Sequence, residues 1–274
     1  MSIDTRTCIV RNTASRRGRN IAVAPGTTAM KNLHYGRIIL DVGDPPVRFD
    51  TAGMETGLVC LRGEAQVRTE GQAFQLRKLD SLYVPRDASI EVAPGPEGCD
   101  LAEIAAPVEK RYPVQFVAFR DVEQDPGLHF TAGVPGSQRQ VSVLLGKNIH
   151  AGRILAGTTY SMPGNWTSWP PHEHAAMLEE AYLYIDMPAP AFGVQLVYTN
   201  PREPELATIV RENDVVLMPA GYHPNVAAPG GPINFLWMMA ANREVEDRQY
   251  GVVNVQPEFA GAGSGIERGR ADRK

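Results

Sequence analysis

Two stretches of the chain, DSLYVPRDASIEVAP at residues 80–94 and DVVLMPAGYHPNVAAP at residues 214–229, follow the same plan. Each begins with an aspartate and a short apolar run, turns at a proline, and continues into a second strand-like run. A strand-like segment that begins with glutamate lies upstream of each stretch, at Glu55 in the first half and at Glu180 in the second. An internal repeat of this kind indicates that one β unit occurs twice.

The repeat predicts an all-β protein built from two jelly-roll β-barrels in one chain. The less regular stretch between the two β units is expected to join them. The predicted segments are an N-terminal extension (1–29), a first barrel (30–110), a connecting segment (111–135), a second barrel (136–258) and a flexible C-terminal tail (259–274).

Composition excludes several classes of protein. The 27 Lys and Arg residues against 31 Asp and Glu give a net charge of −4, with no long run of like charge, so a nucleic-acid partner is not expected. No apolar run approaches the roughly 18 residues of a membrane-spanning helix, and no signal sequence is visible. Cys8, Cys60 and Cys99 are far apart and form no Cys-x-x-Cys pair. A cytoplasmic location, with no membrane partner, is therefore expected.

A candidate metal site lies in the second half. Alternate residues of an extended strand share one face, so the imidazoles of His172 and His174 can reach the same ion. Glu180 begins the next strand-like run, and His223 follows the proline turn of the second repeat stretch. Three imidazoles and one carboxylate leave coordination positions open for water or substrate, as a catalytic site requires.

The two halves differ at this site. Ser89 occupies the place of His223 in the first repeat stretch, and nothing before Glu55 resembles the His172–His174 segment. The first barrel is therefore expected to lack metal ligands. In the second barrel Glu179 remains an alternative to Glu180, which we prefer because it shares the strand phase of the tyrosines that follow. His34, His129 and His150 are interpreted as structural.

The segments Gly164–His174, Glu180–Met187, Gly221–Pro224 and Trp237–Ala240 resemble the cupin isomerases that act on deoxy and keto uronic acids. The resemblance is strongest to the 5-deoxy-glucuronate isomerases of inositol catabolism, with the 4-deoxy-5-keto-uronate isomerases as relatives. It covers residues 135–245 well and residues 30–110 only in pattern. One departure is that five residues separate His174 from Glu180, where four are expected in the pectin-pathway enzymes, and this keeps Glu179 open.

The resemblance implies a double-cupin fold and one divalent metal ion per chain on His172, His174, Glu180 and His223. Zinc or manganese is the first choice, with iron or nickel as alternatives. It also implies a homo-oligomer that interconverts the aldose and ketose forms of a sugar acid, with 5-deoxy-glucuronate to 2-deoxy-5-keto-gluconate as the best candidate. The alternatives are isomerisation of 4-deoxy-5-keto-uronate or glucuronate, an iron-dependent cupin dioxygenase and a non-catalytic sugar-binding cupin.

Ketol isomerisation needs a group that moves a proton between adjacent carbons, and it passes through an enediolate whose negative charge a divalent ion stabilises. Candidate catalytic residues are Glu180, Tyr182 and Tyr198, with Tyr184 on the same strand face as Tyr182. A substrate carboxylate requires a guanidinium partner, since the two groups can form parallel hydrogen bonds. Arg139 and Arg153, on strands that lead into the motif, are the candidates for substrate binding.

Overall fold

The computed structural model describes residues 3–262 and Gly265, and these residues form an almost entirely β protein, as the sequence predicts. In the first half the strands are β1 (Ile9–Val10), β2 (Gly18–Val23), β3 (His34–Leu40), β4 (Val47–Asp50), β5 (Met54–Thr69), β6 (Gln72–Leu76), β7 (Ser81–Val84), β8 (Ser89–Pro107) and β9 (Gln115–Val117). In the second half they are β10 (His129–Ala132), β11 (Arg139–Leu145), β12 (Ile154–Ser161), β13 (Trp166–Thr167), β14 (His172–Glu173), β15 (Leu178–Tyr184), β16 (Gly193–Val197), β17 (Leu206–Val210), β18 (Val215–Met218), β19 (Asn225–Ala227), β20 (Phe235–Ala241) and β21 (Asn254–Val255).

The helices are α1 (Thr5–Cys8), α2 (Phe119–Gln124) and the 3-10 helix η1 (Pro257–Ala262). Among the described residues, none of the helices has the length and apolar character needed to cross a membrane.

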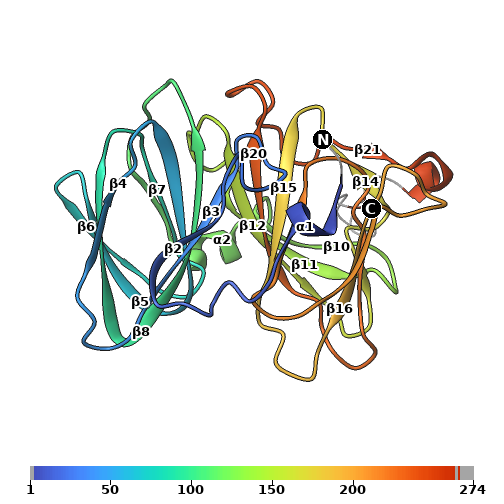
Figure 1. Ribbon diagram of the computed structural model, residues 1–274, viewed down its shortest axis with the longest axis horizontal. Helices are drawn as coiled ribbons and strands as arrows, with labels where there is room; N and C mark the ends of the chain where they lie inside the picture. Colours follow the sequence, from blue (N-terminus) through green and yellow to red (C-terminus); the bar gives the residue numbers. More distant parts are fainter. Residues whose placement is uncertain (1–2, 263–264, 266–274) are drawn as a thin grey trace.

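The strands form two barrels that lie side by side (Figure 1). The main sheet of the first barrel has the order β2-β3-β8-β5-β7-β9, with β4 paired to β8 and β6 paired to β5. The main sheet of the second barrel has the order β10-β11-β12-β20-β15-β18-β1, and β13-β19-β16-β17 forms a further sheet. Because β3-β8-β5-β7 corresponds to β12-β20-β15-β18, the predicted double barrel is confirmed.

The strand register corrects one detail of the sequence comparison. Thr56 is paired with Val84, and Glu180 is paired with Met218, which occupies the place of Val84 in the second repeat stretch. Thr56 is therefore the counterpart of Glu180. Glu55, which sequence comparison matched to Glu180, is instead the counterpart of Glu179.

The structure also corrects the predicted segment boundaries. Residues 1–29 are not an extension, because β1 pairs with β18 of the second barrel and β2 pairs with β3 of the first. Residues 111–135 are not only a connection, because β9 pairs with β7 and β10 pairs with β11. Each barrel thus receives two edge strands from outside its predicted range. Edge strands of two to six residues carry too little hydrophobic pattern to be recognised before their partners are known.

The two faces of each main sheet have different partners. Leu58 and Cys60 of β5 point into the first barrel, where they join an apolar cluster with Leu82 and Leu101. The alternate residues of β5, Gly57 and Val59, face the second barrel. At Gly57 a Cβ atom would lie 2.6 Å from Leu145 Cδ1. The barrels therefore pack closely through the outer faces of their sheets. Apolar side chains fill the interior of the first barrel.

Candidate metal centre and active site

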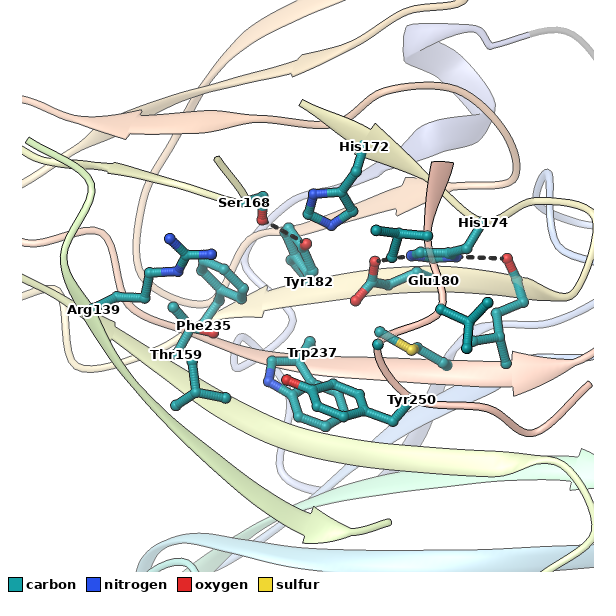
Figure 2. A pocket seen from close by; sticks show the side chains of 16 residues that line it. Arg139, Thr159, Ser168, His172, His174, Glu180, Tyr182, Phe235, Trp237 and Tyr250 are labelled. Atoms are coloured by element: carbon teal, nitrogen blue, oxygen red, sulfur yellow. Dashed lines mark hydrogen bonds and ion pairs between the residues drawn. The ribbon is translucent and has the colours of Figure 1, made fainter. Parts of the chain in front are cut away.

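Three histidines converge inside the second barrel. His172 lies in β14, His174 follows that strand directly, and His223 precedes β19. All three side chains are buried, and one ring nitrogen from each lies within 4.8 Å of the others. Figure 2 shows His172 and His174 pointing toward the space beside Glu180. The three histidines predicted from the sequence are brought together and can hold a metal ion.

Backbone carbonyl groups fix the orientation of the three imidazole rings. Nδ1 lies 2.9 Å from Pro170 O in His172, 3.0 Å from Leu178 O in His174 and 2.9 Å from Gly221 O in His223. A carbonyl can only accept, so each Nδ1 carries the proton and each Nε2 of a neutral ring keeps its lone pair. This arrangement is typical of histidines that bind a metal through Nε2.

Glu180 completes the set of donor atoms. Its Oε2 lies 3.0 Å from His174 Nε2 and 3.1 Å from His223 Nε2. Burial disfavours the charged form of Glu180, but the interactions with His174 and His223 outweigh it and lower the pKa of this carboxyl to about 2. Burial lowers the pKa of His172 to about 3, with a further contribution from His223 and His174, so its ring is neutral at pH 7.

The donor set fits a divalent metal ion. His223 Nε2 is buried, and although Glu180 Oε2 lies 3.1 Å away, this nitrogen makes no well-formed hydrogen bond among the described residues. A buried nitrogen lone pair without a partner is costly unless an ion or water takes it up. Neutral imidazoles and one carboxylate suit zinc, manganese, iron or nickel, so the geometry does not select one metal.

Glu179 points away from this centre. Its carboxylate accepts hydrogen bonds from the backbone N–H groups of Lys31 at 2.8 Å and Asn32 at 2.7 Å, and a further one from Leu33. These three residues belong to the first barrel. The phase argument from the sequence therefore agrees with the structure, because Glu180 faces the histidines and Glu179 faces the neighbouring barrel.

A small cavity of about 50 Å³ adjoins the histidines. Its lining residues are Arg139, Val141, Thr159, Ser168, His172, His174, Leu178, Glu180, Tyr182, Phe235, Trp237, Met239, Tyr250, Gly251, Val252 and Val253. Val252 is half-exposed, whereas the histidines are buried, so the cavity runs inward from the surface near the Gly251–Val253 segment.

Arg139 lies in the wall of this cavity and is 4% exposed (Figure 2). Its guanidinium donates to the backbone carbonyls of Ser137 at 3.0 Å, Trp169 at 3.2 Å and Gly265 at 2.6 Å. Among the described residues no carboxylate forms an ion pair with it, and burial lowers its pKa. A buried cation without a counter-ion is costly, so an anionic group bound in the cavity would be stabilised by Arg139.

Arg153, the second arginine predicted to bind substrate, lies elsewhere. Its guanidinium donates to the carbonyls of Pro107 at 2.7 Å, Ala241 at 2.7 Å and Asn242 at 2.5 Å, which places it at the contact between the barrels. Arg153 is therefore not among the residues that line the cavity. Although Arg153 is close to the histidine motif in the sequence, its side chain does not reach the cavity.

Of the tyrosines predicted from the sequence, one lines the cavity and two lie outside its wall. Tyr182 lines the cavity, and its hydroxyl lies 2.8 Å from Ser168 Oγ. Burial raises its pKa well above the usual range. The hydroxyl of Tyr184 donates to Gln195 at 2.6 Å, outside the cavity wall.

Tyr198 is likewise absent from the cavity lining, and its hydroxyl donates to Gln256 at 2.7 Å. The structure therefore places this catalytic candidate away from the cavity. The physical reason is that Tyr198 begins the loop after β16, a strand of the further sheet, rather than lying on β15 among the metal ligands.

Sequence reasoning missed Trp237 and Tyr250. Their rings stack in the cavity wall with centroids 5.0 Å apart (Figure 2). Neither the indole N–H nor the Tyr250 hydroxyl has a hydrogen-bond partner among the described residues, so both are available to a ligand. Tyr250 belongs to an irregular segment between β20 and β21, and β21 pairs with β14 at His172, so only this long-range pairing brings it to the site.

A buried cluster of three histidines and a glutamate beside a cavity, within one of two β-barrels, defines a double cupin. Solved double-barrel structures agree on the fold. The oxalate decarboxylase of Lactobacillus farciminis in complex with formate is 11% identical, with a TM-score of 0.62 over 95% of this chain and 91% of that one. An IolB-like protein from Salmonella typhimurium LT2 is 23% identical, with a TM-score of 0.82 over 93% of this chain and 98% of that one.

The model of the KduI/IolB family matches residues 8–256, and the chain belongs to this family. The 5-deoxy-glucuronate isomerase of Geobacillus kaustophilus is 28% identical over 253 residues, covering 86% of this chain and 89% of that protein. The corresponding enzyme of Listeria monocytogenes is 24% identical, covering 84% of this chain and 92% of that protein. The chain is thus an isomerase, and the resemblance seen in the sequence is confirmed.

Proposed function

We propose that the protein is a metal-dependent isomerase that interconverts the aldose and ketose forms of a deoxyuronic acid, with 5-deoxy-glucuronate to 2-deoxy-5-keto-gluconate as the first candidate. The observation that carries this proposal is that one cavity is lined by His172 and His174 of the histidine cluster and by Arg139, a buried cation with no carboxylate partner among the described residues. The named activity of the curated relatives supports the choice of substrate.

In this proposal His172, His174, Glu180 and His223 hold one divalent ion, with zinc or manganese as the first choice. When bound, the ion supplies the positive charge that stabilises negative charge on adjacent oxygens of a sugar chain. Glu180 contributes a charged carboxylate to a buried site, and the Nδ1 hydrogen bonds keep the imidazoles oriented. The site residues therefore do not need to reorganise when substrate arrives.

The remaining wall of the cavity binds and orients the substrate. Arg139 pairs with the substrate carboxylate, and the free indole N–H of Trp237 and hydroxyl of Tyr250 donate to its hydroxyl groups. The apolar faces of Phe235 and Met239 exclude water, which strengthens these polar interactions. Tyr182, held by Ser168, is the remaining candidate among the predicted tyrosines for proton transfer.

The proposal predicts that purified protein converts 5-deoxy-glucuronate reversibly to the 2-keto form, that a chelator abolishes this activity and that added divalent metal restores it. In deuterated water an enediolate route places solvent deuterium on the carbon next to the new carbonyl, whereas a direct hydride shift retains the substrate hydrogen. Proton NMR of the product measures this directly. Absence of turnover on a panel of uronate aldehydes, with metal bound and the fold intact, would contradict the proposal. Oxygen uptake would then favour a dioxygenase.

Arg139→Met is expected to lower kcat/KM for the uronate by about 100-fold, since loss of one partner of a buried charge pair costs roughly 2–5 kcal/mol. The corresponding primary amide, which has no negative charge, should show a change of no more than a few-fold. Steady-state kinetics on both compounds, with metal occupancy measured in parallel, tests this. Arg153→Met is the control, and an equal loss on acid and amide would argue against Arg139 as the carboxylate receptor.

A further inference from the structure

Glu55 of the first barrel mirrors the environment of Glu179. Its carboxylate is fully buried and accepts hydrogen bonds from the backbone N–H groups of Gly152 at 2.7 Å, Arg153 at 2.5 Å and Ile154 at 2.8 Å. The Tyr83 hydroxyl donates to it at 2.8 Å. These three amides lead into β12 of the second barrel.

Glu179 makes the reciprocal contact, because the amides of residues 31–33 lead into β3 of the first barrel. The strand register makes the two carboxylates equivalent, since Glu179 is paired with Ala240 of β20 and Glu55 with Ala106 of β8. Each barrel thus contributes one buried glutamate whose carboxylate accepts hydrogen bonds from three successive backbone amides of the other barrel.

The two contacts differ in what lies next to them. Glu179 precedes Glu180, which reaches the histidines from the opposite face of β15, whereas Glu55 precedes Thr56, in a barrel filled by apolar side chains. Hydrogen bonds from N–H groups to a carboxylate are stronger than those between neutral groups. Three such hydrogen bonds to Glu179 fix the position and rotation of β15 next to Glu180, the candidate metal ligand. Neighbouring side chains of a strand move together with its backbone.

We propose that the first barrel stabilises the geometry of the metal centre through its contact with Glu179. Glu179, whose carboxylate accepts hydrogen bonds from the amides of residues 31–33, is a positioning residue. It holds Glu180 in the geometry required for metal binding. The contact at Glu55 joins the barrels without this role. The proposal rests on the metal site proposed above and adds a function for a barrel that has no metal ligands of its own.

Glu179→Gln and Glu55→Gln form a matched pair, since each replaces one buried carboxylate oxygen by an amide NH2 group, which cannot accept a hydrogen bond. Competition with a chromophoric chelator measures the zinc dissociation constant of each full-length variant. We expect the constant to rise about tenfold or more in Glu179→Gln, the loss typical of residues that orient metal ligands. In Glu55→Gln it should stay within about twofold of wild type. Both variants should lower the midpoint of thermal unfolding.

Equal zinc affinity in the two variants would overturn the inference while leaving the metal site standing. Failure of the wild-type protein to bind zinc, manganese, iron or nickel would overturn both. If Glu179→Gln does not fold, hydrogen exchange on the wild-type protein decides the matter, because coupling between two sites is reciprocal. Removal of zinc should then increase amide exchange in the peptide covering residues 31–33 more than in the peptide covering residues 152–154. Equal changes in the two peptides would contradict the proposed coupling.

Discussion

His223→Ala is expected to weaken zinc binding by at least about 100-fold and to reduce isomerase activity to background. The side chain is 1% exposed, and its Nε2 lies 3.1 Å from Glu180 Oε2 without a well-formed hydrogen bond among the described residues. Zinc sites with four protein ligands have total binding free energies of roughly 10–16 kcal/mol, so one ligand accounts for about 3 kcal/mol, or a factor of about 100. Metal analysis after dialysis and a chelator competition measure the loss.

His172→Ala should behave in the same way, whereas His129→Ala serves as the control. His129 is hydrogen-bonded to Ser142 at 2.9 Å and is not among the residues that line the cavity. Circular dichroism establishes that the variants are folded. Full metal occupancy in both His172→Ala and His223→Ala would show that these histidines do not form the site.

Glu180→Gln is expected to lower kcat/KM by about a thousandfold, far more than Glu179→Gln. The change removes a negative charge from a position 3.0 Å from His174 Nε2 and 3.1 Å from His223 Nε2. Loss of one partner of a buried charge interaction costs roughly 3–5 kcal/mol, which corresponds to two to four orders of magnitude in rate. Steady-state kinetics over a range of metal concentrations tests this.

The two variants should also respond differently to metal. Glu179→Gln retains all four candidate ligands, so a higher zinc concentration should restore most of its activity. Glu180→Gln lacks the carboxylate itself, and saturating metal should leave its activity low. A larger effect of Glu179→Gln at saturating metal would move the assignment of the ligand from Glu180 to Glu179.

The barrel architecture and the location of the histidine cluster could both be predicted from the sequence. Both depend on local features, namely strand-length apolar runs around a proline turn and the alternation that places His172 and His174 on one face. The choice of Glu180 over Glu179 also followed from alternation along one strand, and the structure places the two side chains on opposite faces of β15. Local periodicity is sufficient for such features because it requires no knowledge of distant partners.

The tertiary structure alone decided which residues meet across the chain. It brought Tyr250 to the cavity through the pairing of β21 with β14, and it removed Tyr198 and Arg153 from the site. The strand register also moved the match between the two halves by one residue at these glutamates, so that Glu55 is equivalent to Glu179. The carboxylate of each is bound by backbone amides of the other barrel. These relations depend on strand register and on packing between residues more than 40 positions apart. A single sequence contains no periodic signal for either.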